Sequence, residues 1–258
     1  MKKFFGIFMI ICSNCLAWGK LGHQITAKIA EVHLTAASKH KLKLILGNSN
    51  LVTISDWLDQ IRPTRKYLKL HYTTMDDNYN LHESKRNGLL YQGLKQAIET
   101  LKSDDKDINE QKLALKIIVH IVGDAHQPLH VGNGQDAGGN LCFVKWFKRK
   151  RVVPLHKVWD NFLVQATYRQ NPWIVADSLA IAPNIKDNWR HASIFEWLKE
   201  SRQLHKIIYP ESCQKSQPSH LSNDYLIANA KITKTRLEQG GIRLAHILNQ
   251  CLDPKNDA

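Results

Sequence analysis

The sequence has 258 residues, 43% of them hydrophobic, which excludes a low-complexity or fibrous chain. Lys and Arg total 36 against 23 Asp and Glu, so the formal net charge is +13. Such an excess favours polyanionic partners, either nucleic acid or an anionic membrane surface. The 13 histidines are unusually many for a side chain that often binds metals or transfers protons.

The first 17 residues are typical of a secretory signal peptide. Lys2 and Lys3 precede an apolar run over residues 4–11, and a small-residue site ends at Ala17. This run is much shorter than the roughly 20 apolar residues that span a bilayer, so we expect no stable membrane anchor. We expect cleavage after Ala17, a mature chain that begins at Trp18, and a periplasmic or secreted protein of bacterial type.

The remaining residues, 18–258, contain no repeat and no long linker, which predicts a single domain. Apolar residues at helical spacing predict helices over residues 25–46, 89–101, 113–122, 158–166 and 225–252. Residues 141–155 differ, because apolar and aromatic residues there flank the basic run Lys148-Arg149-Lys150-Arg151. That pattern predicts a β-hairpin with a charged turn in an otherwise mainly α fold.

Three cysteines remain after the predicted cleavage, in a compartment where disulfides persist. Cys213 and Cys251 flank the long helical segment near the C-terminus, so we predict that they pair. Cys142 would then be left single.

Two histidine–aspartate pairs with the same four-residue spacing form the densest chemical pattern in the chain. His120 and Asp124 share one face of a helix, and so do His156 and Asp160. His130 can return to the same cluster because a proline ends the helix before it. Zinc binds His nitrogen and carboxylate oxygen and normally takes three or four protein donors, so the pattern predicts a site for more than one ion.

His126 follows a different geometry. It lies about 200° around the helix from Asp124, so we expect its ring to point away from the metal site. It would then either support the ligands from behind or face solvent.

These motifs closely resemble a known family. The string His-x-x-Gly-Asp-x-His-Gln-Pro-Leu-His over residues 120–130 is followed by Gly138-Gly139-Asn140 and then by His156-Lys-Val-Trp-Asp160. Together they resemble the zinc-dependent, single-strand-specific nucleases that include mung bean nuclease and the plant bifunctional nucleases, over nearly the whole chain after the signal. The resemblance implies a single-domain, mainly α fold, shared with zinc-dependent phospholipase C, and three zinc ions per chain.

The resemblance also implies which residues bind each ion. In that family the free amine and carbonyl oxygen of an N-terminal Trp are ligands. Carried over position by position, the first ion would be bound by Asp59, His71, His120 and Asp124, the second by His130, His156 and Asp160, and the third by Trp18, His23 and a bridging Asp124.

The segment Trp57-Leu-Asp59-Gln-Ile-Arg62 matches a family segment in which the Asp is a ligand and the Arg lies near the phosphate. The resemblance therefore makes Arg62 and the bridging Asp124 the expected catalytic residues. Asp56 is a nearby acidic competitor, but only Asp59 has the right offset from Trp57 and Arg62.

Further residues are candidates for substrate binding. Tyr72 could stack on an unpaired base, with ordinary packing as the alternative. Gly138, Gly139 and Asn140 could contact that base through close backbone approach and an amide. The basic turn at residues 148–151 could follow the phosphate backbone of a long strand, and the alternative is a solvated turn that keeps the protein soluble.

One position departs from the family pattern. The family commonly has an acidic residue three positions after the His of its His-aromatic pair, and this chain has Thr74 there. Asp76 or Asp77 could substitute for it. The acid–base residue therefore stays open at the level of sequence.

The resemblance implies hydrolysis of single-stranded DNA and RNA to 5′-phosphate products by a monomer, with 3′-mononucleotides as possible further substrates. The main alternative is a zinc-dependent phospholipase C acting on lipid headgroups, although those enzymes usually carry a Glu where this chain has Asp160. A third class, a zinc-storage or structural protein, would need no Arg62.

Overall fold

The computed structural model describes residues 18–148, 151–168, 187–253 and 255. The expected signal peptide and two residues of the basic turn, Arg149 and Lys150, lie outside this range. The helices are α1 Lys20–His33, α2 Ala36–Leu46, α3 Leu51–Ile54, α4 Trp57–Gln60, α5 Leu90–Lys102, α6 Ile108–Ala125, α7 Leu155–Lys157, α8 Val164–Thr167, α10 Asp187–His191, α11 Ile194–Gln203, α12 His205–Ile208 and α13 Asn223–Leu252. A π-helical segment, Val158–Leu163, joins α7 to α8, and 3-10 turns span Arg62–Thr64, Leu68–His71 and Pro128–His130. The mainly α prediction is confirmed.

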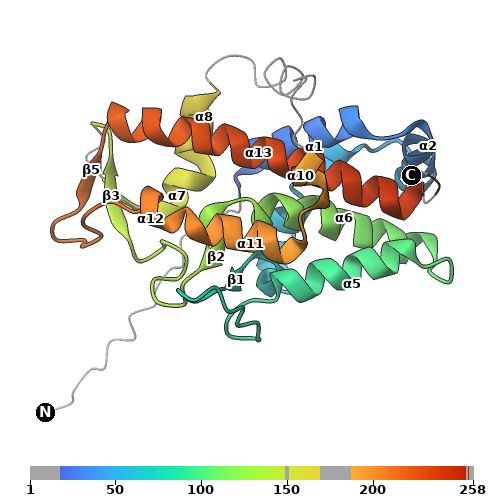
Figure 1. The fold of residues 1–258 in the computed structure, drawn as a ribbon, viewed down its shortest axis with the longest axis horizontal. Coiled ribbons are helices and arrows are strands. Elements are labelled where there is room, and N and C mark those ends of the chain that lie inside the picture. The colour runs from blue at the N-terminus through green and yellow to red at the C-terminus, as the bar shows by residue number, and fades with distance from the viewer. Residues whose placement is uncertain (1–17, 149–150, 169–186, 254, 256–258) are drawn as a thin grey trace, which may run out of the picture.

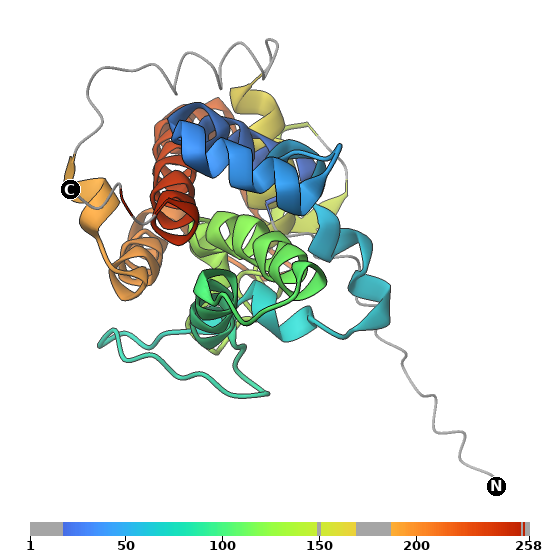
Figure 2. The same cartoon turned by 90° about the vertical axis from the view of Figure 1, so that its right-hand side faces the viewer.

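Helix α6 lies at the centre of the molecule. It packs against α5 on one side and against α1 and α13 on the other, and α1 runs along α13 (Figures 1 and 2). In its C-terminal part, all residues from Ala114 to Ala125 except Lys116 are buried. A helix buried all round in this way is held from every side, so residues at its C-terminal end are well placed to form a site.

Local capping explains where several helices begin. Asp107 starts α6 with a capping box in which its side chain accepts hydrogen bonds from the backbone of Asn109 and Glu110. Thr35 similarly accepts from the backbone N–H of Ser38 and starts α2. The single helix predicted over residues 25–46 is therefore two helices, separated at Leu34 and Thr35.

The predicted hairpin is confirmed and belongs to a larger sheet. Strands β3 Phe143–Trp146 and β4 Val152–Pro154 pair antiparallel, and β5 Ser219–Leu221 adds a parallel strand on the other side of β3. Strands β1 Thr73–Thr74 and β2 Val131–Gly132 form a separate two-stranded parallel sheet. Strand β5 comes from a segment about 70 residues later in the chain, which hairpin signals do not detect.

The disulfide prediction is wrong. Cys142 pairs with Cys213, and Cys251 is a free, buried thiol. Cys142 immediately precedes β3 and the Cys213 carbonyl accepts a hydrogen bond from the Phe143 backbone N–H, so the bridge joins neighbouring segments of one sheet. Cys251 instead packs in the helical core, where burial raises the pKa of its thiol to about 11.

Two hydrophobic clusters make up the core. One surrounds α5, α6 and the C-terminal part of α13, and the other surrounds Trp18, β3, the π-helical segment and the N-terminal part of α13. Among the described residues, no helix is both long and apolar enough to cross a membrane.

We expect replacement of both Cys142 and Cys213 by Ser to lower the free energy of unfolding by about 4 kcal/mol, because the bridge closes a loop of 71 residues. Urea unfolding of the oxidised protein measures this change. Cys251→Ala is the control and should cost much less. A larger loss from Cys251→Ala than from the double replacement would contradict the pairing.

Candidate metal centre

Histidine and aspartate side chains from distant parts of the chain converge at the C-terminal end of α6. His120 and Asp124 come from α6 itself, and His23 comes from α1. The 3-10 turns place His71 and His130, and the α7–π segment places His156 and Asp160.

Three groups within this set have ligand atoms that all lie within 4.8 Å of one another. The groups are His23, His120 and Asp124; Asp59, His71 and His120; and His130, His156 and Asp160. The structure thus brings together every His and Asp that the sequence assigned to the metal site. It differs in one detail, because the ring of His120 lies in two of the groups.

Asp124 is the common neighbour of these groups. Its Oδ1 lies 3.4 Å from His23 Nε2 and 3.4 Å from His130 Nδ1. Its Oδ2 lies 3.2 Å from His71 Nδ1 and 3.4 Å from His120 Nε2. Asp124 therefore lies within 3.4 Å of rings from all three groups.

The other aspartates complete the cluster. Asp160 lies 3.2 Å from His156 Nε2 and 3.8 Å from His130 Nε2. Asp59 lies 3.9 Å from His71 Nδ1. Asp56 instead accepts a hydrogen bond from Gln60 and pairs with Lys20, so its carboxylate is occupied away from the cluster.

Backbone carbonyls orient several of the rings. His120, His130 and His156 each direct Nδ1 at a carbonyl oxygen, of Ser55, His71 and Gly138 respectively, at 2.6–2.8 Å. Because a carbonyl only accepts, Nδ1 donates its proton and Nε2 is the acceptor nitrogen of each ring; in His120 this Nε2 lies 3.1 Å from His71 Nδ1. This is the arrangement that metal-binding histidines show in proteins.

Gln127 is a supporting residue that the sequence did not single out. Its amide donates to Asp160 Oδ1 at 2.6 Å, and its carbonyl oxygen accepts from the Leu129 backbone N–H at 2.6 Å. The side chain is fully buried. Gln127 therefore ties the end of α6 to a carboxylate 33 residues later, and its place between two histidines in the 120–130 motif is the only signal in the sequence that pointed to it.

The cluster fits zinc on the chemistry of its donors. Buried polar atoms without hydrogen-bond partners concentrate here, namely His23 Nε2, Asp59 Oδ1, both carboxylate oxygens of Asp124, His130 Nε2 and Asp160 Oδ2. Burial lowers the pKa of His156 to about 4 and that of His130 well below its usual value, so both rings are neutral at pH 7. Burial also raises the pKa of Asp160 well above its usual range, which a bound cation would reverse. The charge of Asp124 instead raises the pKa of His120. Imidazole nitrogens together with unpaired carboxylate oxygens suit zinc better than magnesium or calcium, which prefer oxygen-only sites.

Trp18 lies beside the cluster. Its indole is fully buried in the second core cluster, and the backbone N–H of the next residue, Gly19, donates to the Asp160 carbonyl at 2.7 Å. Gly22 packs directly under the Trp18 side chain, where an added Cβ would come within 2.9 Å of Trp18 Cβ. The start of the predicted mature chain is thus anchored next to an expected ligand.

Arg62 borders the cluster from the first 3-10 turn. Its Nη1 lies 3.5 Å from Asp59 Oδ1 and is buried without a hydrogen-bond partner. The guanidinium side chain keeps 22% of its surface exposed. It can therefore reach both the ligand group and a molecule that enters from solvent.

Thr74 and the two aspartates that could replace an acidic residue there, Asp76 and Asp77, all have hydrogen-bond or ion-pair partners outside the metal cluster. The Thr74 hydroxyl donates to the Asn87 carbonyl, and the Asp76 carboxylate accepts from Asn80 and His82. Asp77 pairs with the Arg202 guanidinium. These contacts support the loop after β1, and within the described residues neither aspartate belongs to a metal-binding group.

The residues expected to bind a base lie beside the cluster, but the Tyr72 hydroxyl, the Gly138 carbonyl and the Asn140 amide already have hydrogen-bond partners within the protein. Gly138 and Gly139 have φ angles of +62° and +77°, and an added Cβ at Gly138 would come within 2.3 Å of the Leu129 carbonyl oxygen. Glycine is therefore required there to turn the chain and to present its carbonyl to His156. The Asn140 amide donates to the Ala137 carbonyl, and the Tyr72 hydroxyl accepts from Lys69 Nζ.

The basic turn is described only at its ends, where Lys148 and Arg151 are both exposed.

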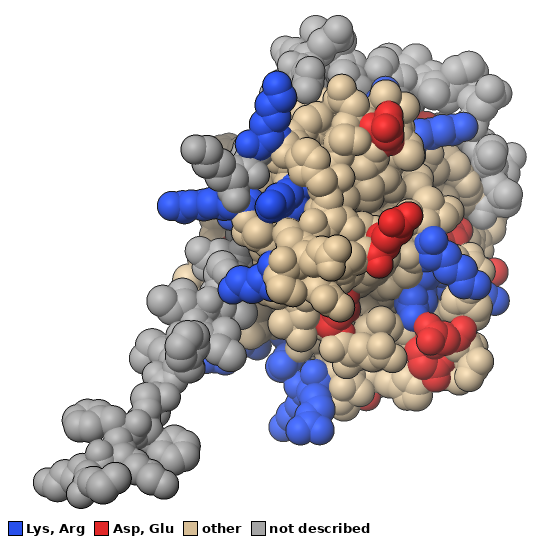
Figure 3. All heavy atoms as spheres, turned by 90° about the vertical axis from the view of Figure 1, so that its left-hand side faces the viewer, with Lys and Arg blue, Asp and Glu red and all other residues tan. Residues whose placement is uncertain are grey.

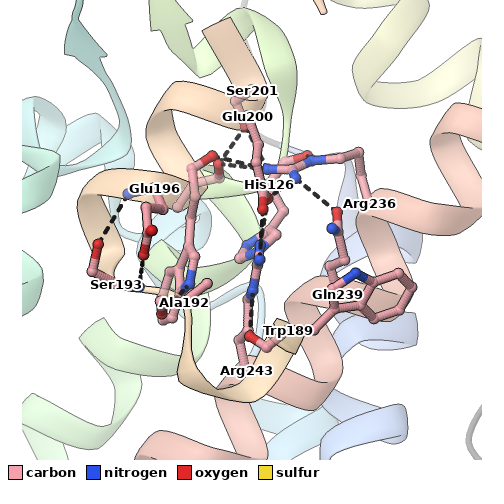
Figure 4. A network of polar contacts seen from close by, with 12 residues as sticks. His126, Trp189, Ala192, Ser193, Glu196, Glu200, Ser201, Arg236, Gln239 and Arg243 are labelled. Carbon is pink, nitrogen blue, oxygen red and sulfur yellow. Dashed lines mark hydrogen bonds and ion pairs between the residues drawn. The ribbon is translucent and has the colours of Figure 1, made fainter. Parts of the chain in front are cut away.

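His126 does point away from the metal cluster, as predicted, but it does not face solvent. Its ring is fully buried, its Nδ1 donates to the Val122 carbonyl at 2.7 Å, and its Nε2 accepts from Arg243 at 3.0 Å (Figure 4). Arg243 in turn makes a two-pronged ion pair with Glu200 at 2.7 and 2.8 Å. Burial and the nearby guanidinium groups hold the pKa of His126 well below its usual value.

Arg236 holds the end of α6 in the same network (Figure 4). Its guanidinium donates to the His126 carbonyl at 3.2 Å and to Ser201 Oγ at 2.7 Å, and Ser201 donates to the Ala125 carbonyl at 2.6 Å. The last carbonyls of a helix have no partner within the helix, and positive charge is favourable at that end. Arg236 therefore fixes the terminus from which Asp124 and Gln127 project.

A mainly helical chain that gathers three His/Asp groups around one buried carboxylate, with an arginine at the edge, fits the class of metal-dependent hydrolases. The S1/P1 nuclease family model matches residues 18–253, and the chain belongs to this family. The chain is 30% identical over 281 residues to endonuclease 4 of Arabidopsis thaliana, covering 95% of this chain and 92% of that protein. It is 31% identical to endonuclease 1 of the same plant (94% and 90% covered) and 22% identical to nuclease P1 of Penicillium citrinum (90% and 97% covered).

Family membership makes the protein a nuclease of the single-strand-specific endonuclease type. The phospholipase C alternative is not favoured.

We expect Gln127→Met to weaken metal binding at the group of His130, His156 and Asp160 by about 10- to 100-fold, because supporting hydrogen bonds typically contribute that much to metal affinity. Metal content after equilibration against graded chelator concentrations measures the loss. Gln96→Met, an exposed replacement on α5, is the matched control. Equal metal retention in both variants would show that Gln127 does not support the site.

Proposed function

We propose that this protein is an extracytoplasmic, zinc-dependent endonuclease that hydrolyses single-stranded DNA and RNA to 5′-phosphate products and also dephosphorylates 3′-mononucleotides. The observation that carries the proposal is the set of adjoining His/Asp groups around Asp124 in a chain of the S1/P1 nuclease family. Residues 1–17 would be removed as a signal peptide, residues 18–258 would form one nuclease domain, and the enzyme would act as a monomer.

Three zinc ions per chain account for the donor set. One would be held by Asp59, His71, His120 and Asp124, a second by His130, His156 and Asp160, and a third by His23, Asp124 and the amine and carbonyl of Trp18. The buried, unpartnered donor atoms support this assignment. When bound, zinc lowers the pKa of water and neutralises charge on phosphoryl oxygens.

The chain's own residues bind and orient the substrate. Arg62 would contact the phosphate through its planar guanidinium, since Nη1 lies beside Asp59 and lacks a hydrogen-bond partner. Asp124 would hold the ligand groups at a fixed separation from its place in the buried end of α6. Tyr72 and the backbone of residues 138–140 would seat an unpaired base, which requires a strand that is not stacked in a duplex.

The experiment that tests this function is a substrate panel with purified mature protein. We expect hydrolysis of single-stranded DNA and of RNA, much slower hydrolysis of duplex DNA, and none of phosphatidylcholine. Chelation should abolish the activity and added zinc should restore it. Hydrolysis of phosphatidylcholine without hydrolysis of single strands would overturn the proposal.

Arg62→Ala should lower kcat/KM on single-stranded DNA by about 100- to 1,000-fold, as the loss of one preorganised donor does in other enzymes. Its zinc content should equal that of the wild type, because Arg62 is not a ligand. Arg65→Asn is the matched control, since Arg65 is exposed and has a φ of +61° that asparagine tolerates. A full loss of zinc in Arg62→Ala would show instead that Arg62 organises the ligands.

A further inference from the structure

The outer face of the three-stranded sheet carries side chains that the core does not use. Along β3, Val144 and Trp146 are buried, whereas Lys145 is exposed and Phe143 is half-buried. Among the described residues, Phe143 is not packed against either hydrophobic cluster. Its ring is instead partly covered by Lys215, whose ammonium lies 5.5 Å from the ring centroid. Phe143 therefore presents an aromatic face on the outside of the molecule.

The strand register extends this face across all three strands. Lys145 lies between Val152 on β4 and His220 on β5, and Phe143 lies opposite Pro154. Val152 and Pro154 are half-buried, and His220 is exposed. We call these residues the outer sheet face: Phe143, Lys145, Val152, Pro154, Lys215 and His220.

The surroundings of the outer sheet face are strongly basic. Within the described residues 143–148 and 151–157, Lys145, Lys148, Arg151 and Lys157 are exposed and no residue is acidic, and residues 211–221 contain one Lys and one Glu. Figure 3 faces this end of the molecule and shows Lys and Arg side chains spread over it, with acidic side chains mainly toward one side. A surface with this charge is complementary to a polyanion.

The sheet is continuous with the metal centre. Strand β3 begins three residues after Asn140, and β4 runs directly into α7, which carries His156. The Leu155 backbone N–H donates to the Cys142 carbonyl at 2.7 Å, so the two connections are also joined to each other. Both strands of the hairpin are therefore joined through the chain to residues of the candidate site, β3 to residues 138–140 and β4 to His156.

We propose that the outer sheet face binds the single-stranded nucleic acid that extends from the metal centre, with a base stacked on Phe143 in the place that the Lys215 ammonium now occupies, and with phosphates bound by Lys145 and the displaced Lys215. This inference rests on the proposed function, because it assumes that the scissile strand occupies the metal centre. An aromatic ring beside spaced cations is the combination that binds single strands without sequence preference.

The test measures binding by the zinc-loaded protein of two hydrolysis-resistant phosphorothioate probes, a 20-nucleotide oligothymidylate and a dinucleotide. Lys145→Ser with Lys215→Ser should make the slope of log K against log salt shallower by about 1.4 for the 20-mer, since each single-strand phosphate contact contributes about 0.7. Phe143→Thr should weaken 20-mer binding by about fivefold or more with little change in slope. Dinucleotide binding should not change in either variant, because the proposal assigns to the outer sheet face only the part of the strand that extends beyond the metal centre.

The control is Lys41→Ser with Lys43→Ser, which removes two exposed cations from α2 at the opposite end of the molecule (Figure 1). If Phe143→Thr does not fold, Phe143→Leu removes the aromatic face while keeping an apolar side chain, and the same loss is expected. Unchanged 20-mer affinity and salt slope in the sheet variants would overturn the inference. So would weaker binding to anionic phosphatidylglycerol vesicles with unchanged 20-mer binding, which would assign the face to a membrane.

Wild-type cleavage of an unmodified single strand tests the proposed function separately. Cleavage together with unchanged binding in the sheet variants would reject only the outer sheet face. Absence of cleavage by the zinc-loaded wild type would reject the proposed function, whatever the binding results show.

Discussion

The buried carboxylate of Asp124 is the feature on which the rest of the structure depends. It is fully buried, and four imidazole rings approach its two oxygens within 3.4 Å. An isolated carboxylate in such a place would cost several kcal/mol unless cations or donors compensated it. The four histidines come from α1, α6 and two 3-10 turns, so these four segments meet at this one group. Stability and metal binding are therefore coupled at the centre of the molecule.

The backbone around the site works as a scaffold for the rings. The carbonyl of His71 accepts from His130, so one expected ligand residue orients another. The carbonyl of Gly138 accepts from His156, and only a glycine fits the left-handed backbone that presents it. Such contacts restrict each ring to one tautomer and one direction. A shift of the loop 133–140 would therefore also move the His156 ring, which donates to the Gly138 carbonyl.

On the side of α6 away from the ligands, Arg236, Arg243 and Glu200 form an ion-pair network. Arg236 and Arg243 are almost fully buried, share Glu200, and contact the backbone or side chain of His126. Burying two guanidinium groups is expensive unless each is hydrogen-bonded on most sides, and here nearly every donor has a partner. Helix α13 thereby holds the end of α6 by directional bonds as well as by apolar packing. The ligands project from a terminus that is fixed on both sides.

Much of this protein follows from local sequence patterns. The helical periods, the β3–β4 hairpin and the pairs His120/Asp124 and His156/Asp160 depend on residues close together in the chain, whose relative positions a helix or strand dictates. The choice of Asp59 over Asp56 came instead from the resemblance to the family, whose Trp-x-Asp-x-x-Arg segment matches Trp57, Asp59 and Arg62. The boundary between α1 and α2 at Thr35 is also a local feature that the sequence could have predicted, since Thr is a good helix N-cap.

Other features depend on which distant segments pack together. Spacing in the chain suggested Cys213 with Cys251, but a disulfide needs its two Cα atoms to be neighbours in space, and only the pairing of β3 with β5 brings Cys142 to Cys213. The sequence pattern did not distinguish Gln127, Arg236 and Arg243 from other polar residues, because their hydrogen-bond partners are 33 to 117 residues away in the chain. The outer position of Phe143 likewise follows from the direction in which the whole sheet faces the core. A one-dimensional pattern carries the preferences of neighbours, whereas burial and pairing across the chain are set only when the complete set of segments packs.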